Sequence, residues 1–149
     1  MKTGSCQCGA IKYQLESEPL MTYACHCKDC QKRTGSAFSM GVIFPTEALD
    51  LSGELTAWDR ISDDGNANTR YSCSQCGNVI YGASTASPQA IKLQAGTLDD
   101  TQDVKPDVHI LAESAQAWVN IPSEDLRYDT QPDNLMDIFA AVQMKRDKA

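Results

Sequence analysis

The sequence predicts a mainly β protein that ends in one helix. Apolar and polar residues alternate in many short segments, as at Ile11, Tyr13 and Leu15, which is typical of half-buried strands. Glycine, proline, asparagine and aspartate separate these segments at short intervals, as expected for turns. With 149 residues, of which 42% are apolar and 22% charged, the chain has the size and composition of one ordinary globular domain.

Seven segments have strand-like patterns. They are residues 10–15, 21–27, 37–44, 55–60, 69–73, 79–83 and 91–95. Turn residues lie between them, including Glu18-Pro19, Ser52-Gly53 and the run at residues 63–66. No internal repeat interrupts this series. Many short strands with turn signals between them indicate an all-β domain.

Only the C-terminal segment has the spacing of an amphipathic helix. Its apolar residues recur at i, i+3, i+4 and i+7, namely Leu135, Ile138, Phe139 and Val142. An N-cap candidate precedes them, and basic residues follow them, where cations suit the helix dipole. We expect this helix to pack on the domain, with a homodimer contact as the alternative. Residues 1–130 are therefore predicted to form the domain, and residues 131–149 to be its helical extension.

Charge and hydropathy argue against several classes of partner. Thirteen Lys and Arg against twenty Asp and Glu give a net charge of −7, so neither nucleic acid nor an anionic membrane is an expected partner. A membrane-spanning helix needs about 20 apolar residues, and the longest apolar runs are far shorter. The N-terminus also lacks the apolar core of a signal peptide. These features predict a cytoplasmic protein, in which cysteines stay reduced and more often bind metal than form disulfides.

The seven cysteines fall into three clusters, and none stands alone. The clusters are Cys6-Gln7-Cys8, Cys25-His26-Cys27-Lys28-Asp29-Cys30 and Cys73-Ser74-Gln75-Cys76. In an extended strand residues i and i+2 face the same side, so each Cys-x-Cys pair is expected to bind one ion. The Cys-x-x-Cys pair is followed by Gly77, which can take the positive φ that a metal-binding turn often needs.

Ligand counting predicts two zinc ions per chain. Structural zinc sites are closed by four protein ligands, whereas catalytic sites keep one position open. The most economical partition puts Cys6, Cys8, Cys73 and Cys76 on a structural zinc, and Cys25, Cys27 and Cys30 on an open, functional one. The triplet with one cysteine from a pair would also supply four ligands. Iron or an iron–sulfur cluster would also suit four cysteines, and spacing alone leaves these alternatives open.

An open site made of three thiolates suits the capture of another thiol. Three thiolates exceed the charge of Zn²⁺ by one, which weakens the ion as a Lewis acid, while an incoming thiol still loses its proton on coordination. Lys28, Lys32 and Arg33 are candidates to offset this charge and to bind a substrate carboxylate, with Arg33 favoured because it lies near the triplet. For the two lysines, an ordinary role as solvated surface cations explains the sequence at least as well as a functional role does.

The remaining candidates are predicted to be structural. His26 lies between two ligands and is expected to face away from the metal, in a packing or supporting role. His109 is adjacent to apolar residues and is expected to be a structural histidine. Trp58 and Trp118 are expected in the core. No phosphate-binding glycine loop and no Ser/His/Asp motif is present.

Three motifs, in this order, resemble the glutathione-dependent formaldehyde-activating enzyme family, whose relatives include centromere protein V. They are residues 4–10 (Gly-Ser-Cys-Gln-Cys-Gly-Ala), residues 25–30 with Thr34-Gly35-Ser36, and residues 70–77 (Arg-Tyr-Ser-Cys-Ser-Gln-Cys-Gly). Weaker similarity extends the match from about residue 2 to residue 128, so that the 1–130 segment is identified as a domain of this family.

The resemblance implies both a fold and an activity. The fold would be several short, coiled antiparallel sheets around zinc sites, as in methionine-R-sulfoxide reductases. The resemblance implies structural zinc on Cys6, Cys8, Cys73 and Cys76, and functional zinc on Cys25, Cys27 and Cys30. The implied activity joins glutathione and formaldehyde, and is that of a carbon–sulfur lyase in reverse. The alternatives are a non-catalytic protein that binds glutathione or another thiol, and a zinc-stabilised protein-interaction module.

Overall fold

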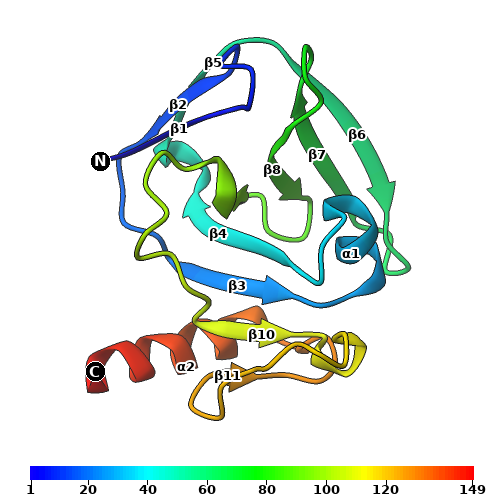
Figure 1. The fold of residues 1–149 in the computed structure, drawn as a ribbon, viewed down its shortest axis with the longest axis vertical. Coiled ribbons are helices and arrows are strands. Elements are labelled where there is room, and N and C mark those ends of the chain that lie inside the picture. The colour runs from blue at the N-terminus through cyan, green and yellow to red at the C-terminus, as the bar shows by residue number, and fades with distance from the viewer. The chain divides into compact units, whose positions relative to one another are not determined.

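The computed structural model describes residues 1–149 and shows a mainly β protein with two α-helices (Figure 1). The strands are β1 (Lys2–Ser5), β2 (Lys12–Leu15), β3 (Met21–Cys25), β4 (Ser39–Pro45), β5 (Leu49–Ser52), β6 (Leu55–Ile61), β7 (Ala67–Cys73), β8 (Val79–Ser84), β9 (Ala90–Gln94), β10 (Val108–Ile110) and β11 (Leu126–Arg127). The helices are α1 (Lys28–Thr34) and α2 (Leu135–Lys148). The predicted fold class, with a C-terminal helix, is confirmed. No helix is long and apolar enough to cross a membrane.

The chain forms two compact units, and each contains one group of cysteines. Unit 1 comprises Met1–Leu20 and Val42–Asp103, and unit 2 comprises Met21–Gly41 and Val104–Ala149. Strand β4 begins in unit 2 and ends in unit 1.

Unit 1 is built from antiparallel strands. Strands β1, β2 and β5 form one sheet in that order, and β6 to β9 pair in sequence order in a second one. The alternation predicted around β2 is confirmed, because Ile11, Tyr13 and Leu15 are all buried. The Tyr13 hydroxyl lies 2.8 Å from the Thr97 hydroxyl, which satisfies two buried polar groups at once.

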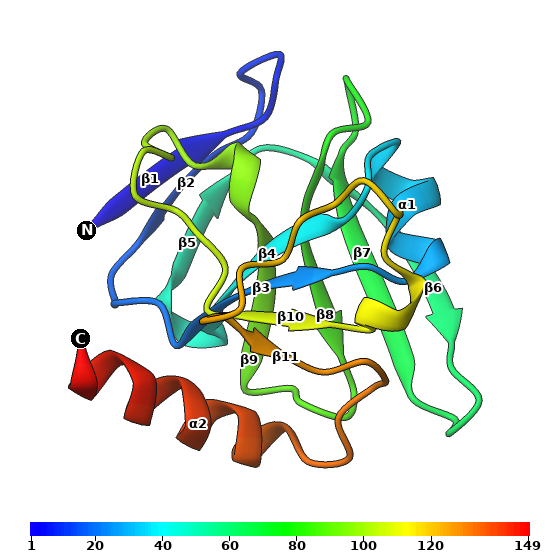
Figure 2. The same cartoon turned by 60° about the horizontal axis from the view of Figure 1, so that its bottom comes forward.

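Unit 2 contains parallel pairs, which the sequence did not predict. Strand β10 lies between β11 and β3 and is parallel to both, and the three strands are side by side in Figure 2. A hairpin can join only antiparallel neighbours. Strands β3 and β10 are separated by a long stretch of chain, so no turn signal in the sequence defines their direction.

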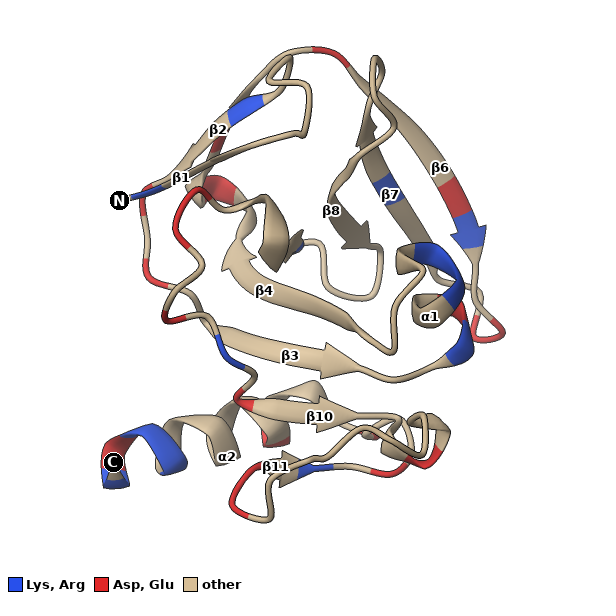
Figure 3. Ribbon diagram, viewed as in Figure 1, with Lys and Arg blue, Asp and Glu red and all other residues tan.

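Helix α2 is capped and anchored within unit 2. The Asn134 side chain caps its first turn by accepting from the amide of Met136 at 2.9 Å, while Ile138 and Val142 are buried. The basic residues gather at its C-terminal end (Figure 3), where Lys145 pairs with Asp125 at 3.0 Å and Arg146 pairs with Asp107 at 2.7 Å. The predicted amphipathic helix is therefore present, with part of its apolar face buried in the chain itself.

Helix α1 is an element that the sequence analysis missed, because only the C-terminal segment was predicted to be helical. Residues 21–27 were expected to be one strand. The strand ends at Cys25 instead. Helix α1 buries no residue, so it has no apolar stripe that a periodicity search could detect. Its ends are defined locally, because the Cys27 sulfur accepts from the Cys30 amide and Gly35 takes a left-handed φ of 64°. Strands β1, β5, β10 and β11 were also not predicted.

The prediction that both tryptophans lie in the core is wrong. Trp58 is 57% exposed and Trp118 is 74% exposed. Trp58 lies on β6, where six of seven residues are exposed, and its ring packs against the Arg70 guanidinium, 5.3 Å from the ring centroid. Trp118 lies in the irregular segment after β10 and forms part of a groove described below.

Candidate metal centres

Unit 1 brings the four cysteines of the two outer motifs together. The sulfurs of Cys6, Cys8, Cys73 and Cys76, here the closed cluster, all lie within 4.8 Å of one another. Cys6 Sγ is 3.5 Å from Cys8 Sγ, which is 3.8 Å from Cys73 Sγ. A tetrahedral zinc with Zn–S bonds of about 2.3 Å places its sulfurs about 3.8 Å apart. None of the seven cysteines forms a disulfide, so this donor set fits a closed tetrahedral ion.

Two glycine-closed turns build the closed cluster, rather than the extended strand expected for the first pair. Strand β1 ends at Ser5, and Cys6 and Cys8 lie in a turn in which the Gly9 amide donates to the Cys6 carbonyl at 3.0 Å. The Gly77 amide donates to the Cys73 carbonyl at 2.9 Å in the second turn. Both glycines have positive φ, 80° and 73°, as was expected at Gly77. The sulfurs converge because the chain turns, not because they share a strand face.

Hydrogen bonds favour the thiolate form of part of the closed cluster. Burial opposes ionisation of Cys6, but donation from the Ile11 amide and the neighbouring thiols lowers the pKa of Cys6 to about 6. The Ala10 amide favours the Cys8 thiolate, yet the hydrogen bonds with the neighbouring thiols and burial together outweigh it and raise the pKa of Cys8 to about 12. Without a cation, the neighbouring sulfurs share protons, and a divalent ion would displace them.

Unit 2 brings together the triplet, which consists of Cys25, Cys27 and Cys30. Their sulfurs lie within 4.8 Å of one another, and no fourth His, Cys, Asp or Glu joins the group. Cys25 is the last residue of β3 and is buried, while Cys27 caps α1 and Cys30 lies on it. The turn from strand to helix, rather than a shared strand face, makes the three sulfurs converge. The group has the open composition that ligand counting predicted.

Arg33 places a positive charge against the triplet. Its Nη2 lies 3.8 Å from Cys30 Sγ and donates to the buried Ser39 hydroxyl at 2.6 Å. Hydrogen bonding from Cys25 is the main reason that the pKa of Cys30 falls to about 5, and Cys27 and Arg33 lower it further. The same Cys25–Cys30 interaction, together with burial, raises the pKa of Cys25 far above its usual value. Arg33 therefore lies where charge compensation was predicted, and its binding of substrate stays a prediction.

The two histidines form a buried pair, of which His26 lies between Cys25 and Cys27 in the sequence. His26 Nε2 is 3.0 Å from His109 Nδ1, and the His26 ring also packs on Phe38 with ring centroids 5.2 Å apart. Burial lowers the pKa of both histidines, which favours their neutral forms. His109 Nε2 lies 3.5 Å from an Asp125 carboxylate oxygen. Both residues are thus buried in the packing positions that were expected of them, and a supporting role for His26 at a metal stays a prediction.

Two residues near the triplet were missed at the level of sequence. The Gln31 side chain donates to the carbonyl of His26 at 2.8 Å and so holds the chain between Cys25 and Cys27. Tyr23 precedes Cys25 by two residues on β3, and alternation along the strand was the available signal. Burial, followed by the thiolate charges of Cys30 and Cys25, raises the pKa of the Tyr23 phenol well above its usual value.

Comparisons with known proteins agree with this arrangement. A sequence model of the family described as glutathione-dependent formaldehyde-activating enzyme matches residues 1–114. A protein of Halomonas elongata, provisionally named as such an enzyme, is 27% identical over 128 residues, which are 82% of both chains. A protein of Emericella nidulans with the same provisional name is 35% identical over 79 residues, which are 52% of this chain and 40% of the fungal one. The match therefore spans less than half of the fungal protein.

A solved structure supports the fold independently. The crystal structure of a Rhodobacter sphaeroides protein superposes with a TM-score of 0.52, at 15% sequence identity, over 85% of this chain and 98% of the other. At this identity the likeness concerns the fold alone. The family match extends over more than half of the chain and includes all three cysteine motifs. The chain therefore belongs to the glutathione-dependent formaldehyde-activating enzyme family.

Proposed function

We propose that this protein is a zinc-dependent carbon–sulfur lyase, which binds glutathione at the triplet and interconverts glutathione plus formaldehyde with S-hydroxymethylglutathione. The observation that carries the proposal is the triplet itself, three converging sulfurs with no fourth protein ligand and with a guanidinium 3.8 Å from one of them. A closed site has no position for a substrate, whereas a three-ligand site keeps one. In this proposal the closed cluster binds a structural zinc.

The proposed reaction is an addition of a thiol to a carbonyl group. The glutathione sulfur forms a bond to the formaldehyde carbon, the C=O π bond breaks, and the proton lost by the thiol ends on the aldehyde oxygen. Zinc, when bound, supplies a Lewis acid that favours the thiolate form of the substrate and fixes the position of its sulfur. The reverse reaction follows the same path and makes the protein a lyase.

The residues around the triplet have distinct roles in this proposal. Cys25, Cys27 and Cys30 provide the three protein ligands. The guanidinium of Arg33 offsets the excess negative charge of three thiolates, which would otherwise repel an incoming thiolate. Gln31 holds the backbone between the first two ligands. Tyr23 stays neutral at physiological pH and so adds no further negative charge.

Exchange spectroscopy by NMR tests the proposal without a coupled enzyme. The zinc-loaded protein should accelerate exchange between free glutathione and its hydroxymethyl adduct in both directions, because a catalyst cannot move the equilibrium. Replacement of Cys25 or Cys30 by Ser should abolish the acceleration, since each change removes one of three protein ligands. The Trp58→Phe variant is the matched control, because Trp58 lies in unit 1 on an exposed strand.

The outcomes separate the proposal from its alternatives. Exchange at the spontaneous rate, with two zinc ions bound per chain, would refute formaldehyde–glutathione chemistry. If glutathione still bound under those conditions, the protein would be a non-catalytic thiol binder. If no thiol bound, a zinc-stabilised interaction module would be the remaining interpretation.

A further inference from the structure

A groove in unit 2 lies along helix α1, the helix that carries Cys30 of the triplet. It has a volume of about 540 Å³, within the usual range for small-molecule sites. Seven residues line it, namely Gln31, Lys32, Gly35, Ser36, Ala37, Gln116 and Trp118. The first of them follows Cys30 directly in the sequence. The groove therefore begins at the element that carries the last cysteine of the triplet.

One amide side chain joins the groove to the chain around the triplet. The Gln31 Nε2 group donates to the carbonyls of His26 at 2.8 Å and Ser114 at 2.9 Å. The same Gln31 accepts through Oε1 from Gln116 Nε2 at 3.3 Å. The Gln31 side chain thus holds both one wall of the groove and the chain between Cys25 and Cys27. A ligand in the groove would therefore contact residues whose positions are fixed relative to the triplet.

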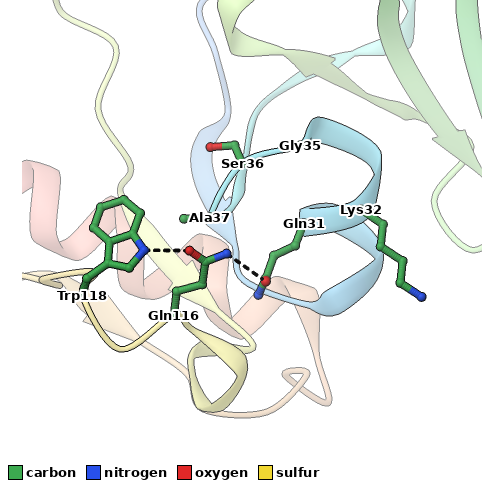
Figure 4. A pocket seen from close by; sticks show the side chains of 7 residues that line it. All are labelled: Gln31, Lys32, Gly35, Ser36, Ala37, Gln116 and Trp118. Atoms are coloured by element: carbon green, nitrogen blue, oxygen red, sulfur yellow. Dashed lines mark hydrogen bonds between the residues drawn. The ribbon is translucent and has the colours of Figure 1, made fainter.

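Trp118 is exposed but held in place. Its indole N–H donates to Gln116 Oε1 at 2.7 Å, which continues the hydrogen-bond chain from Gln31 (Figure 4). The indole is 74% exposed, and its N–H is already satisfied. A large apolar ring that is fixed by its polar edge, and open on its faces, is suited to packing on a planar group of a ligand.

The segment that carries Trp118 is strained and tied down. Leu111 has a left-handed φ of 53°, which is rare for a residue other than glycine. The amides after it donate to the Tyr128 and Asp129 carbonyls, at 3.1 and 3.2 Å. Strain of this kind persists only where the surroundings enforce it, and it precedes the short turn whose Ser114 carbonyl accepts from Gln31.

The groove offers an aromatic ring that can pack on a planar group of a ligand and one ammonium group that can pair with an anion. Apolar contact comes from Trp118 and Ala37, while the second N–H of Gln116 and the Ser36 hydroxyl offer hydrogen bonds. Lys32 is its only charged residue, and in Figure 4 the ammonium extends outward from the α1 side. This composition suits a peptide-like ligand with a carboxylate at one end. A small thiol without such arms would contact none of these groups.

We infer that the groove binds the peptide arms of the thiol substrate, with Trp118 packed against a planar peptide unit and Lys32 paired with a terminal carboxylate. This inference rests on the proposed function, because it takes the substrate sulfur to be at the triplet. It makes Trp118 and Lys32 specificity determinants that distinguish a thiol peptide such as glutathione from a small thiol such as 2-mercaptoethanol.

The test compares these two thiols on the cobalt(II)-loaded protein, in which the sulfur-to-metal absorption band reports binding. Trp118→Ala should weaken glutathione binding about 2- to 10-fold, as loss of an aromatic contact predicts, and leave 2-mercaptoethanol unchanged. Lys32→Gln should weaken glutathione binding about 2- to 5-fold, less at high salt. Trp58→Ala, the matched control, should change neither. Equal effects of Trp118→Ala on both thiols, or no effect on either, would overturn the inference.

A second measurement separates failure of the groove from failure of the proposed function. The chain has two tryptophans, so Trp58→Phe leaves Trp118 as the sole indole fluorophore. S-methylglutathione has the peptide arms but no free thiol, and it should change the Trp118 emission with a saturable dependence on concentration. The absence of a saturable change refutes the groove. If neither thiol produces a cobalt band while S-methylglutathione saturates, the groove stands and capture of the thiol by the triplet is refuted.

Discussion

Replacing Arg33 by Met should raise the pKa of Cys30 and so weaken the preference of the triplet for its ionised form. The guanidinium lies 3.8 Å from Cys30 Sγ. At that distance two unit charges interact by about 4 kcal/mol at an effective dielectric of about 20, and by about 1 kcal/mol in bulk water. Since one pKa unit is about 1.4 kcal/mol, the expected rise is about 1 to 3 units. The pKa of Cys30 is about 5 in the native protein.

The sign follows from the charges. A neighbouring cation stabilises the thiolate and not the thiol, so its removal favours the protonated form and moves the titration to higher pH. Hydrogen bonding from Cys25 is the larger cause of the low pKa and stays in place, which is why the pKa should not return fully to its ordinary value. Arg33→Lys keeps the charge and should restore part of the shift.

The assay is alkylation of Cys30 by iodoacetamide in metal-free, reduced protein, followed by mass spectrometry across a pH series. Circular dichroism at each pH checks that the protein stays folded. Lys28→Met is the matched control, because Lys28 is an exposed cation on the same helix. If the alkylation midpoints of Arg33→Met and the native protein coincide, the charge of Arg33 does not act on Cys30 and the electrostatic reasoning is wrong.

The other predictions concern stability. Cys73→Ser should unfold the protein whereas Cys27→Ser should leave it folded, because a closed zinc site contributes directly to folding free energy; equal losses in thermal unfolding would contradict the proposed roles. Burial keeps the pKa of His109 below its unfolded value of about 6.5, so the stability that neutral His109 contributes is complete above that pH and is lost as pH falls below it. In urea unfolding at several pH values, the free energy of unfolding of His109→Gln should therefore fall less steeply with decreasing pH than that of the native protein. An unchanged pH dependence would show that His109 does not contribute to acid destabilisation. Gly41→Ala should destabilise by about 1–3 kcal/mol, because a Cβ there meets an aromatic ring of β3, whereas Gly96→Ala has open space and should cost little in the same assay.

Local patterns determined much of the fold. The alternation at Ile11, Tyr13 and Leu15 predicted a buried strand face, and all three residues are buried. Helix α2 followed from its i, i+3, i+4 spacing. These predictions hold because the periods of strand and helix are set by the backbone within a few residues. Helix α1 has no buried residue, so the same reasoning could not find it.

In the candidate sites, too, some features follow from short sequence spacings and others from contacts between residues far apart in the sequence. The sequence by itself determined three cysteine clusters and favoured an open set of three ligands, because short spacings limit which sulfurs can reach one ion. Only the tertiary structure decided which distant residues meet. Cys8 approaches Cys73 across 65 positions, His26 meets His109 across 83, and Gln31 reaches Ser114 across 83. Such contacts come from the pairing and packing of whole segments, which the local periodicity of apolar residues does not specify. They also bring together the residues that line the groove, including the exposed Trp118.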